Sequence, residues 1–178
     1  MTGRVAECAW LERDIEGHVA ADAFRSGMAS VCTSVAVVTA VHGGQPHGTT
    51  VGTFSALSLD PPLILVSLAR TSDLLRFVRG SRRFGVNVLS EDQSDLAARF
   101  ATKGPDKFAG VEAELCDGLP RLRDAGVWLA CDVYEFVDGG DHVIVIGGVS
   151  WIDSVSFRPL LYHRRSFAAL GSSFGSSG

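Results

Sequence analysis

The chain consists mostly of short apolar runs separated by breaks rich in Gly, Pro and Asp, a pattern typical of strands joined by turns. The run at 34–41 is β-branched and apolar, which predicts a strand buried on both faces, and the chain returns through 48–59 to form a hairpin. Pro61 and Pro62 break the pairing before the next strand. Further strands are expected at 63–68, 83–89, 111–115, 126–137, 142–152 and 160–164.

Helical periodicity is limited to three places. Residues 4–31 carry an imperfect apolar stripe, with Asp22 expected as the N-cap of a second helix in that segment. A short helix is expected at 72–79, with Ser72 as its N-cap. Ser90 and Gln93 fit a capping box that opens a helix through Phe100.

These elements predict a mainly β protein with short helices. Six or seven strands joined by hairpins favour an antiparallel sheet that closes, wholly or partly, into a barrel and so removes its exposed edges. Strands and helices do not alternate regularly, which disfavours a doubly wound parallel sheet. We expect a helical extension at 1–22, one domain at 23–170 and a flexible tail at 171–178 with the sequence G-S-S-F-G-S-S-G.

Composition narrows the function classes. The chain has 178 residues, 46% apolar and 20% charged, with a formal charge of −4, which argues against nucleic-acid binding. Four cysteines without a CxxC pair disfavour a zinc site, and we expect no metal. No apolar run approaches the roughly 20 residues that cross a bilayer, and no signal-peptide core is present, so the prediction is a cytoplasmic protein.

The segment His47–Ser72 carries the strongest functional signal, because small hydroxylated residues fill both of its strands. They are Thr49, Thr50, Thr53, Ser55, Ser58, Ser67, Thr71 and Ser72. Buried hydroxyls need hydrogen-bond partners, and so many of them indicate a polar ligand with a phosphate and a hydrogen-bonding ring edge. No P-loop is present, so hydroxyls, backbone N–H groups and Arg70 would hold the phosphate.

The order of several segments resembles the flavin reductase-like family of FMN-binding split barrels from about Phe24 to Leu170. The matching segments are S-V-A-V-V-T-A, G-T-T-V-G-T-F-S-A-L-S-L-D-P-P-L-I-L-V-S-L, F-G-V-N-V-L-S-E-D-Q-S-D-L-A-A-R-F-A, P-D-K-F-A-G, G-D-H and P-L-L-Y-H-R-R-S-F. The resemblance implies a homodimer whose six-stranded antiparallel Greek-key barrel binds flavin near the subunit interface. It also implies hydride transfer from NADH or NADPH to FMN, FAD or riboflavin, with reduced flavin passing to a partner flavin-dependent monooxygenase.

The resemblance also assigns roles to residues. The polar edge of the flavin ring would meet Thr49, Thr50, Gly52 and Thr53, with the hydroxyls of Thr50 and Thr53 as expected donors. The ribityl chain and phosphate would meet Ser67, Leu68, Ala69, Arg70, Thr71 and Ser72, where a helix begins and favours an anion. The nicotinamide nucleotide would meet His142 of the G-D-H motif, with Arg164 as a second candidate. No catalytic acid or base is expected, because hydride transfer is cofactor chemistry that needs positioning.

Other interpretations remain open. Gly52 and Thr53 stand where the family often has Ser or Asn, which leaves flavin selectivity undecided. A non-enzymatic flavin- or haem-binding split-barrel carrier or sensor is the alternative function, and solvated edge strands would explain the hydroxyls without a ligand. The pyridoxamine-phosphate oxidase relatives share the barrel, but their phosphate-binding basic residues cannot be found here. Lys107 and Phe108 could close over the nucleotide, but an exposed loop lysine is the preferred interpretation. Asn87 needs a partner if it is buried, either backbone or flavin, and a structural role is favoured.

Overall fold

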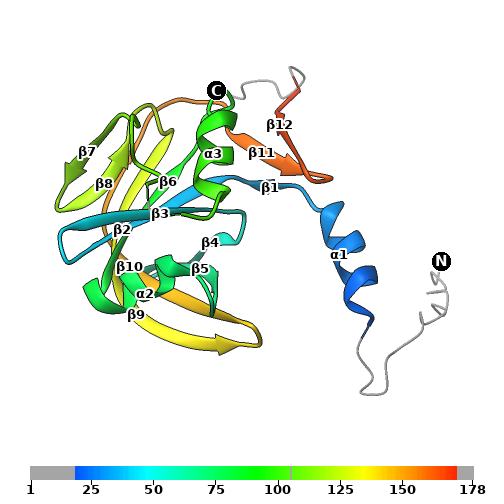
Figure 1. The fold of residues 1–178 in the computed structure, drawn as a ribbon, viewed down its shortest axis with the longest axis horizontal. Helices are drawn as coiled ribbons and strands as arrows, with labels where there is room; N and C mark the ends of the chain where they lie inside the picture. The colour runs from blue at the N-terminus through cyan, green and yellow to red at the C-terminus, as the bar shows by residue number, and fades with distance from the viewer. Residues whose placement is uncertain (1–18, 105, 172–178) are drawn as a thin grey trace, which may run out of the picture.

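The computed structural model describes residues 19–104 and 106–171, which form one body of strands with a helical arm projecting from it (Figure 1). The elements are α1 (Ala21–Ala29), β1 (Thr33–Ser34), β2 (Ala36–His42), β3 (Gln45–Val51), β4 (Phe54–Leu59), β5 (Pro62–Ala69), α2 (Asp73–Ser81), β6 (Arg83–Val88), α3 (Ser94–Ala101), β7 (Ala113–Cys116), β8 (Leu119–Leu122), β9 (Val127–Gly139), β10 (His142–Ser154), β11 (Leu160–His163) and β12 (Ser166–Ala169). The mainly β prediction with short helices is confirmed.

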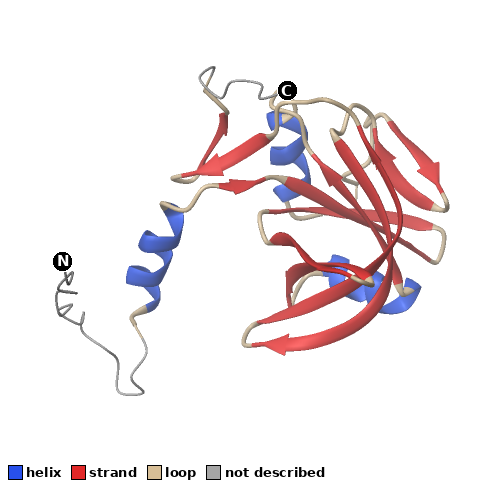
Figure 2. Ribbon diagram, turned by 180° about the vertical axis from the view of Figure 1, so that it is seen from behind, coloured by secondary structure: helices blue, strands red, loops and turns tan. Residues whose placement is uncertain are grey.

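The main sheet is antiparallel and has seven strands in the order β3-β2-β6-β9-β10-β5-β4. Its two edge strands, β3 and β4, follow each other in the chain with only Gly52 and Thr53 between them. The sheet therefore curls until its edges approach at these two residues (Figure 2). The expected count of six strands is not found, and no ladder joins the two edges within the described residues, so the barrel is open there.

The hairpin prediction is correct at one end and wrong at the other. Strands β2 and β3 pair as expected, with Val38 opposite Thr49. The predicted return strand at 48–59 is two strands, because Gly52 and Thr53 leave the ladder and β4 turns away to pair with β5. Their apolar and polar pattern runs on without a proline, so the break carried no clear sequence signal.

Two smaller sheets flank the main one. Strand β7 pairs with β8, and β1, β11 and β12 form a three-stranded sheet. The sequence predicted a strand near β7 and β11 but missed the four-residue strands β8 and β12. Such short strands offer too few positions for a period of two to be read.

The helices also depart from expectation in detail. Helix α1 has Ala20 as its N-cap, so Asp22 lies inside the first turn, while the predicted helical residues 4–18 lie outside the described residues. Ser72 is the N-cap of α2, as predicted. Only half of the capping box forms before α3: the Gln93 side chain accepts from the Ser90 N–H at 3.0 Å, but the helix begins at Ser94. None of the described helices has the length and apolar character required for a membrane span.

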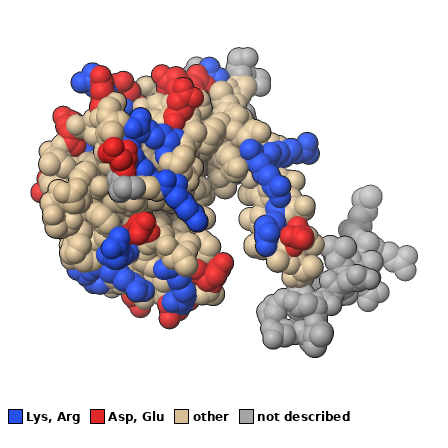
Figure 3. Space-filling model, in the orientation of Figure 1, with Lys and Arg blue, Asp and Glu red and all other residues tan. Residues whose placement is uncertain are grey.

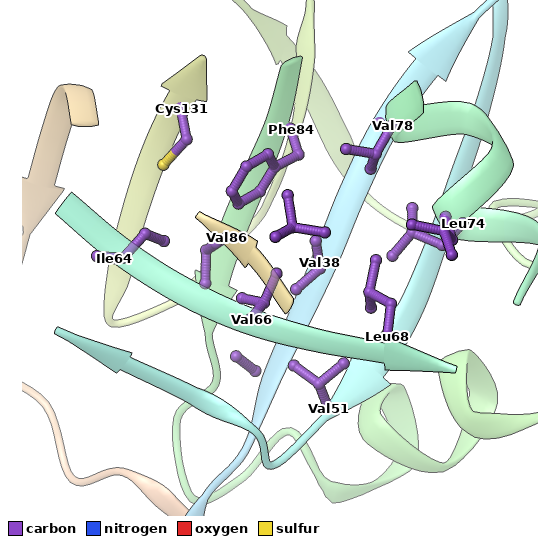
Figure 4. Close-up of a cluster of buried hydrophobic side chains, with 14 of the residues drawn as sticks. Val38, Val51, Ile64, Val66, Leu68, Leu74, Val78, Phe84, Val86 and Cys131 are labelled. Atoms are coloured by element: carbon purple, nitrogen blue, oxygen red, sulfur yellow. The ribbon is translucent and has the colours of Figure 1, made fainter. Parts of the chain in front are cut away.

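The core has two parts on opposite faces of β2. Val38 lies inside the curled sheet with Val66, Leu68, Phe84 and Val86, which point toward one another (Figure 4). On the other face, Val37 packs with Phe100 of α3 and with Leu89. This arrangement explains why the run at 34–41 is apolar on both faces, as predicted. Helix α2 covers the first part through the side chains Leu74, Leu75 and Val78.

Candidate functional site

The structure joins the two hydroxyl-rich segments at the point where the edges of the sheet approach. The Thr53 hydroxyl donates to the Ser67 carbonyl at 2.8 Å, and the Ser67 N–H donates to the Thr53 carbonyl at 3.1 Å. The segments 49–53 and 67–72, predicted to bind the two ends of a flavin, therefore meet at Thr53 and Ser67.

The free edge of β3 presents backbone groups beside this junction. The Leu89 N–H bonds the Val35 carbonyl, so alternate residues from 35 onward direct their backbone groups toward β6, and those between them direct theirs toward β3. By the observed register, Gly48 and Thr50 then point their N–H and C=O groups away from β2, toward the free edge. A donor and an acceptor on one residue suit the pyrimidine edge of a flavin, which carries both.

A cavity of about 500 Å³ opens at this edge. Thr50 and Gly52 line one side and Ala98 of α3 another, while the β11–β12 hairpin contributes Tyr162 and Arg165. The volume lies within the range of small-molecule sites, and α3 adds only small side chains to the lining. Tyr162 and Phe167 pack edge to face at 5.5 Å between ring centroids. Sequence reasoning missed Tyr162 and Arg165, although both stand in the segment P-L-L-Y-H-R-R-S-F that carries the resemblance.

The hydroxyls of this surface are largely engaged within the protein. Thr50 Oγ1 donates to the Ala97 carbonyl at 2.6 Å, and Thr53 Oγ1 donates to Ser67. The Thr49 hydroxyl accepts from Lys107 Nζ at 3.4 Å. In this structure the hydrogens of Thr50 and Thr53 are donated inside the chain, which leaves the oxygen lone pairs and the edge backbone groups to meet a ligand. The expected donor role of these two hydroxyls does not fit this arrangement.

The residues 67–72, predicted to meet the phosphate, differ in how deeply they are buried. The Leu68 side chain is 2% exposed and belongs to the core, so only its backbone could meet a ligand. Ser67 and Ala69 are half-buried, and Thr71 is exposed. The Ser72 side chain makes no capping hydrogen bond to the described residues, so it leaves the first N–H groups of α2 without a hydroxyl acceptor.

Arg70 connects this segment to the turn between β9 and β10. Its Nε donates to the Gly140 carbonyl and its Nη2 to Asp138 Oδ1, both at 2.8 Å. The Arg70 N–H also donates to the Asp141 carbonyl at 3.0 Å. These three contacts hold the turn that carries the G-D-H motif.

His142 and Arg164 lie on different hairpins. His142 pairs with Ala69 across the ladder, and its Nδ1 lies 2.7 Å from Asp141 Oδ1. That contact lowers the pKa of the Asp141 carboxyl and leaves Nε2 of the imidazole for another partner. Arg164 lies in the β11–β12 turn, and its N–H donates to the Ala29 carbonyl at 2.7 Å. Figures 1 and 2 show the two turns well apart, so the structure does not bring these two candidates together in one chain.

Lys107 is buried, so the expectation of an exposed loop lysine is wrong. Its Nζ donates to the carbonyls of Gly48 and Phe100, each at 3.0 Å, and lies near the Thr49 hydroxyl. Burial lowers the pKa of this ammonium, and Asp73 partly offsets that effect. No carboxylate in the described part of the chain lies within ion-pair distance of Lys107, so neutral oxygens hold the charge against the free edge of β3.

Charge is otherwise mixed over the molecule. Figure 3 shows basic and acidic side chains interspersed on the face that it presents, and a hollow between the main body and the arm formed by α1. Among residues 19–104 and 106–171, no group of three or more His, Cys, Asp or Glu side chains is placed to hold a metal ion.

A curled antiparallel sheet with an open cavity at a free strand edge defines a small, partly open β-barrel. The chain belongs to the flavin reductase like domain family, whose match covers residues 28–171. The predicted family and the prediction of a flavin reductase are thereby confirmed.

Individual relatives agree with this assignment. The reductase subunit HsaB of a flavin-dependent monooxygenase from Mycobacterium tuberculosis is 40% identical over 153 residues, covering 83% of this chain and 81% of that protein. The NADH:riboflavin 5'-phosphate oxidoreductase of Streptomyces pristinaespiralis is 40% identical over 154 residues, covering 84% and 88%. The crystal structure of nitrilotriacetate monooxygenase component B from Mycobacterium thermoresistibile superimposes with a TM-score of 0.84 at 36% identity, covering 88% and 90%.

Proposed function

We propose that this flavin reductase transfers a hydride from NADH or NADPH to FMN and supplies the reduced flavin to a separate flavin-dependent monooxygenase. The observation that carries the proposal is the family match over nearly the whole described chain, together with the cavity at the free edge of β3. FMN is favoured because one relative is named for riboflavin 5'-phosphate, and FAD and riboflavin are further acceptors to be tested. Action in the cytoplasm remains a prediction from the sequence.

The residues around the cavity fit a flavin. The outward N–H and C=O groups of Thr50 match a ring edge that both donates and accepts, and Gly52 lines the same cavity. Ser67, Ser72 and the first turn of α2 offer hydroxyls and N–H groups for a phosphate. The guanidinium of Arg70, the arginine of that segment, is already bonded to Gly140 and Asp138, so the phosphate would be held by neutral contacts, which suits a flavin that must leave.

The protein's part in the reaction is positioning. Bound flavin supplies the hydride-accepting ring, and the chain contributes a rigid strand edge on one side and His142 for the nucleotide. Holding two reactants in a near-attack arrangement supplies about 7–11 kcal/mol of the barrier without an acid or base. Reduced flavin is more anionic, and N–H groups directed at the ring would favour that form.

Initial rates test the function directly. We expect the purified protein to oxidise NADH only when flavin is added, with a rate that saturates in FMN. Parallel rates with FAD, riboflavin and NADPH define both specificities. No flavin-dependent oxidation with either nucleotide would reject the proposal, and flavin binding without turnover would favour the carrier or sensor.

The role of His142 has its own test. His142→Ala should raise the KM for the nucleotide more than the KM for FMN, because the imidazole is proposed to contact only the nucleotide. His163→Gln is the matched control, since His163 lies on β11 outside the proposed contacts. Equal increases in both constants for His142→Ala would remove His142 from the nucleotide subsite.

A homodimer completes the proposal. Phe24 and Met28 of α1 are 59% and 49% exposed, and no residue of α1 is buried by the described part of the chain. A second apolar surface lies on β4 and β10, where Trp151 and Ile152 are 62% and 61% exposed beside an apolar cavity of about 410 Å³. Both apolar surfaces are buried from solvent when α1 of one copy covers β4 and β10 of the other.

A further inference from the structure

Arg70 lies where the ladder between β5 and β10 ends. The last paired residue of β5 is Ala69, opposite His142, and the turn Gly140–Asp141 extends beyond the end of β5. Past that point the contacts from this side come from Arg70: its guanidinium bonds the Gly140 carbonyl and Asp138, and its N–H bonds the Asp141 carbonyl.

The contacts fix the orientation of the turn at three points. Gly140 has a positive φ of 65°, so the backbone changes direction there, and the carbonyl groups of residues 140 and 141 both point to Arg70. Asp141 in turn holds His142 Nδ1 at 2.7 Å. A chain of contacts therefore runs from the 67–72 segment through Arg70 to the imidazole.

We propose that Arg70 is a positioning residue for the nicotinamide nucleotide: it fixes the β9–β10 turn so that His142 faces the nucleotide beside bound flavin. The proposal rests on the proposed function, and it gives Arg70 a different role from the phosphate contact expected from the sequence. Because Arg70 follows the flavin segment directly in the chain, it also couples the two subsites.

Asp138 separates the two roles of Arg70. A direct phosphate contact needs the guanidinium but not Asp138, whereas the positioning role needs both. FMN and riboflavin differ only by the phosphate, so comparing them reports any phosphate contact. Arg123→Ala is the matched control, because Arg123 forms an exposed pair with Glu112 at 2.7 Å outside the proposed flavin and nucleotide contacts.

The experiment measures KM for NADH, FMN and riboflavin in Arg70→Ala, Asp138→Asn, the double variant and Arg123→Ala. We expect Arg70→Ala and Asp138→Asn each to raise the KM for NADH roughly three- to fivefold with either flavin, the scale of an exposed ion pair. The KM for NADH of the double variant should rise no further than that of Arg70→Ala alone, because both changes break one arrangement. Arg123→Ala should leave all three constants unchanged.

Amide hydrogen exchange gives a readout independent of turnover. Exchange at residues 139–142 of the flavin-free protein should quicken in Arg70→Ala and Asp138→Asn and stay unchanged in Arg123→Ala. A rise in the KM for FMN but not riboflavin in Arg70→Ala, with Asp138→Asn like wild type, would overturn the positioning role. Failure of the proposed function would look different, because the wild-type protein itself would not oxidise NADH.

Discussion

At the scale of single residues, buried polar side chains decide how this chain is held together. Asn87 is fully buried, and its Nδ2 donates to the carbonyls of Val37 and Pro120 while its Oδ1 accepts from the Leu122 N–H at 2.8 Å. The interpretation of Asn87 as a structural residue is therefore confirmed. Its place in an apolar strand predicted that a partner was needed, but not that the partners would come from β8.

His47 makes stability depend on pH. Burial lowers its pKa below 6.5, with further lowering from Lys107 and an opposing effect of Asp73. Above pH 6.5 the ring is neutral in both folded and unfolded chains, but below it the unfolded chain binds a proton first, so the free energy of unfolding falls. We expect the urea midpoint to drop between pH 7.5 and pH 5.5, and His47→Gln to reduce that drop. His163→Gln is the control, and an unchanged drop in His47→Gln would contradict the assignment.

Residue types in the site could be predicted, but their hydrogen-bond partners could not. The sequence predicted that residues 49–53 and 67–72 meet a flavin, and the Thr53–Ser67 contacts bring these two segments together. It could not show that the Thr50 hydroxyl bonds α3, or that Lys107 reaches β3 from 59 positions away. Such contacts depend on the packing of distant segments, which leaves no local pattern.

At the scale of elements, close packing limits the size of the side chain that β10 can carry where it faces β6. Gly147 of β10 faces Phe84 of β6, and a Cβ at this glycine would lie 2.5 Å from the buried ring. At the next residue, Gly148, the nearest atoms to a Cβ would lie at 3.9 Å. The ladder between β9 and β10 also shifts register at Gly147, so a close approach and a bulge coincide.

This pair of glycines gives a matched test. Gly147→Ala should destabilise the protein by about 1–3 kcal/mol, because the added methyl group overpacks the core against Phe84. Gly148→Ala should change stability by less than about 0.5 kcal/mol. Denaturant unfolding of both variants checks the difference, and equal stabilities would show that Phe84 moves aside freely. The sequence predicted the strand but not the bulge, because a glycine in a strand can mark a bulge, a bend or a close approach.

At the scale of the whole molecule, the proposed dimer explains surfaces that one chain leaves bare. Family resemblance predicted a homodimer, and the structure adds two apolar surfaces that such an assembly could cover, one on α1 and one on β4 and β10. The curled sheet was predicted from hairpins alone, whereas the seven-strand count was not, because β3 and β4 read as one strand.

Sedimentation tests the assembly. Phe24→Asp and Trp151→Asp, on the two surfaces, should each weaken a wild-type dimer, since burying one large apolar side chain contributes about 2 kcal/mol, or roughly thirtyfold in the dissociation constant. Leu115→Asp is the control, because Leu115 is 69% exposed on β7 outside both surfaces. A monomeric wild-type protein, or a dimer weakened by Leu115→Asp alone, would contradict this interface.

Lys107 also restricts β-pairing of other chains with the free edge of β3. An open strand edge is a template on which a foreign strand can add, and proteins that leave one exposed tend to aggregate. The ammonium of Lys107 occupies the Gly48 carbonyl at that edge and lies near the hydroxyl of the neighbouring Thr49. The same side chain that steadies the strand beside the cavity thus blocks chain-to-chain β-pairing upstream of it, while the groups of Thr50 stay open to a small ligand.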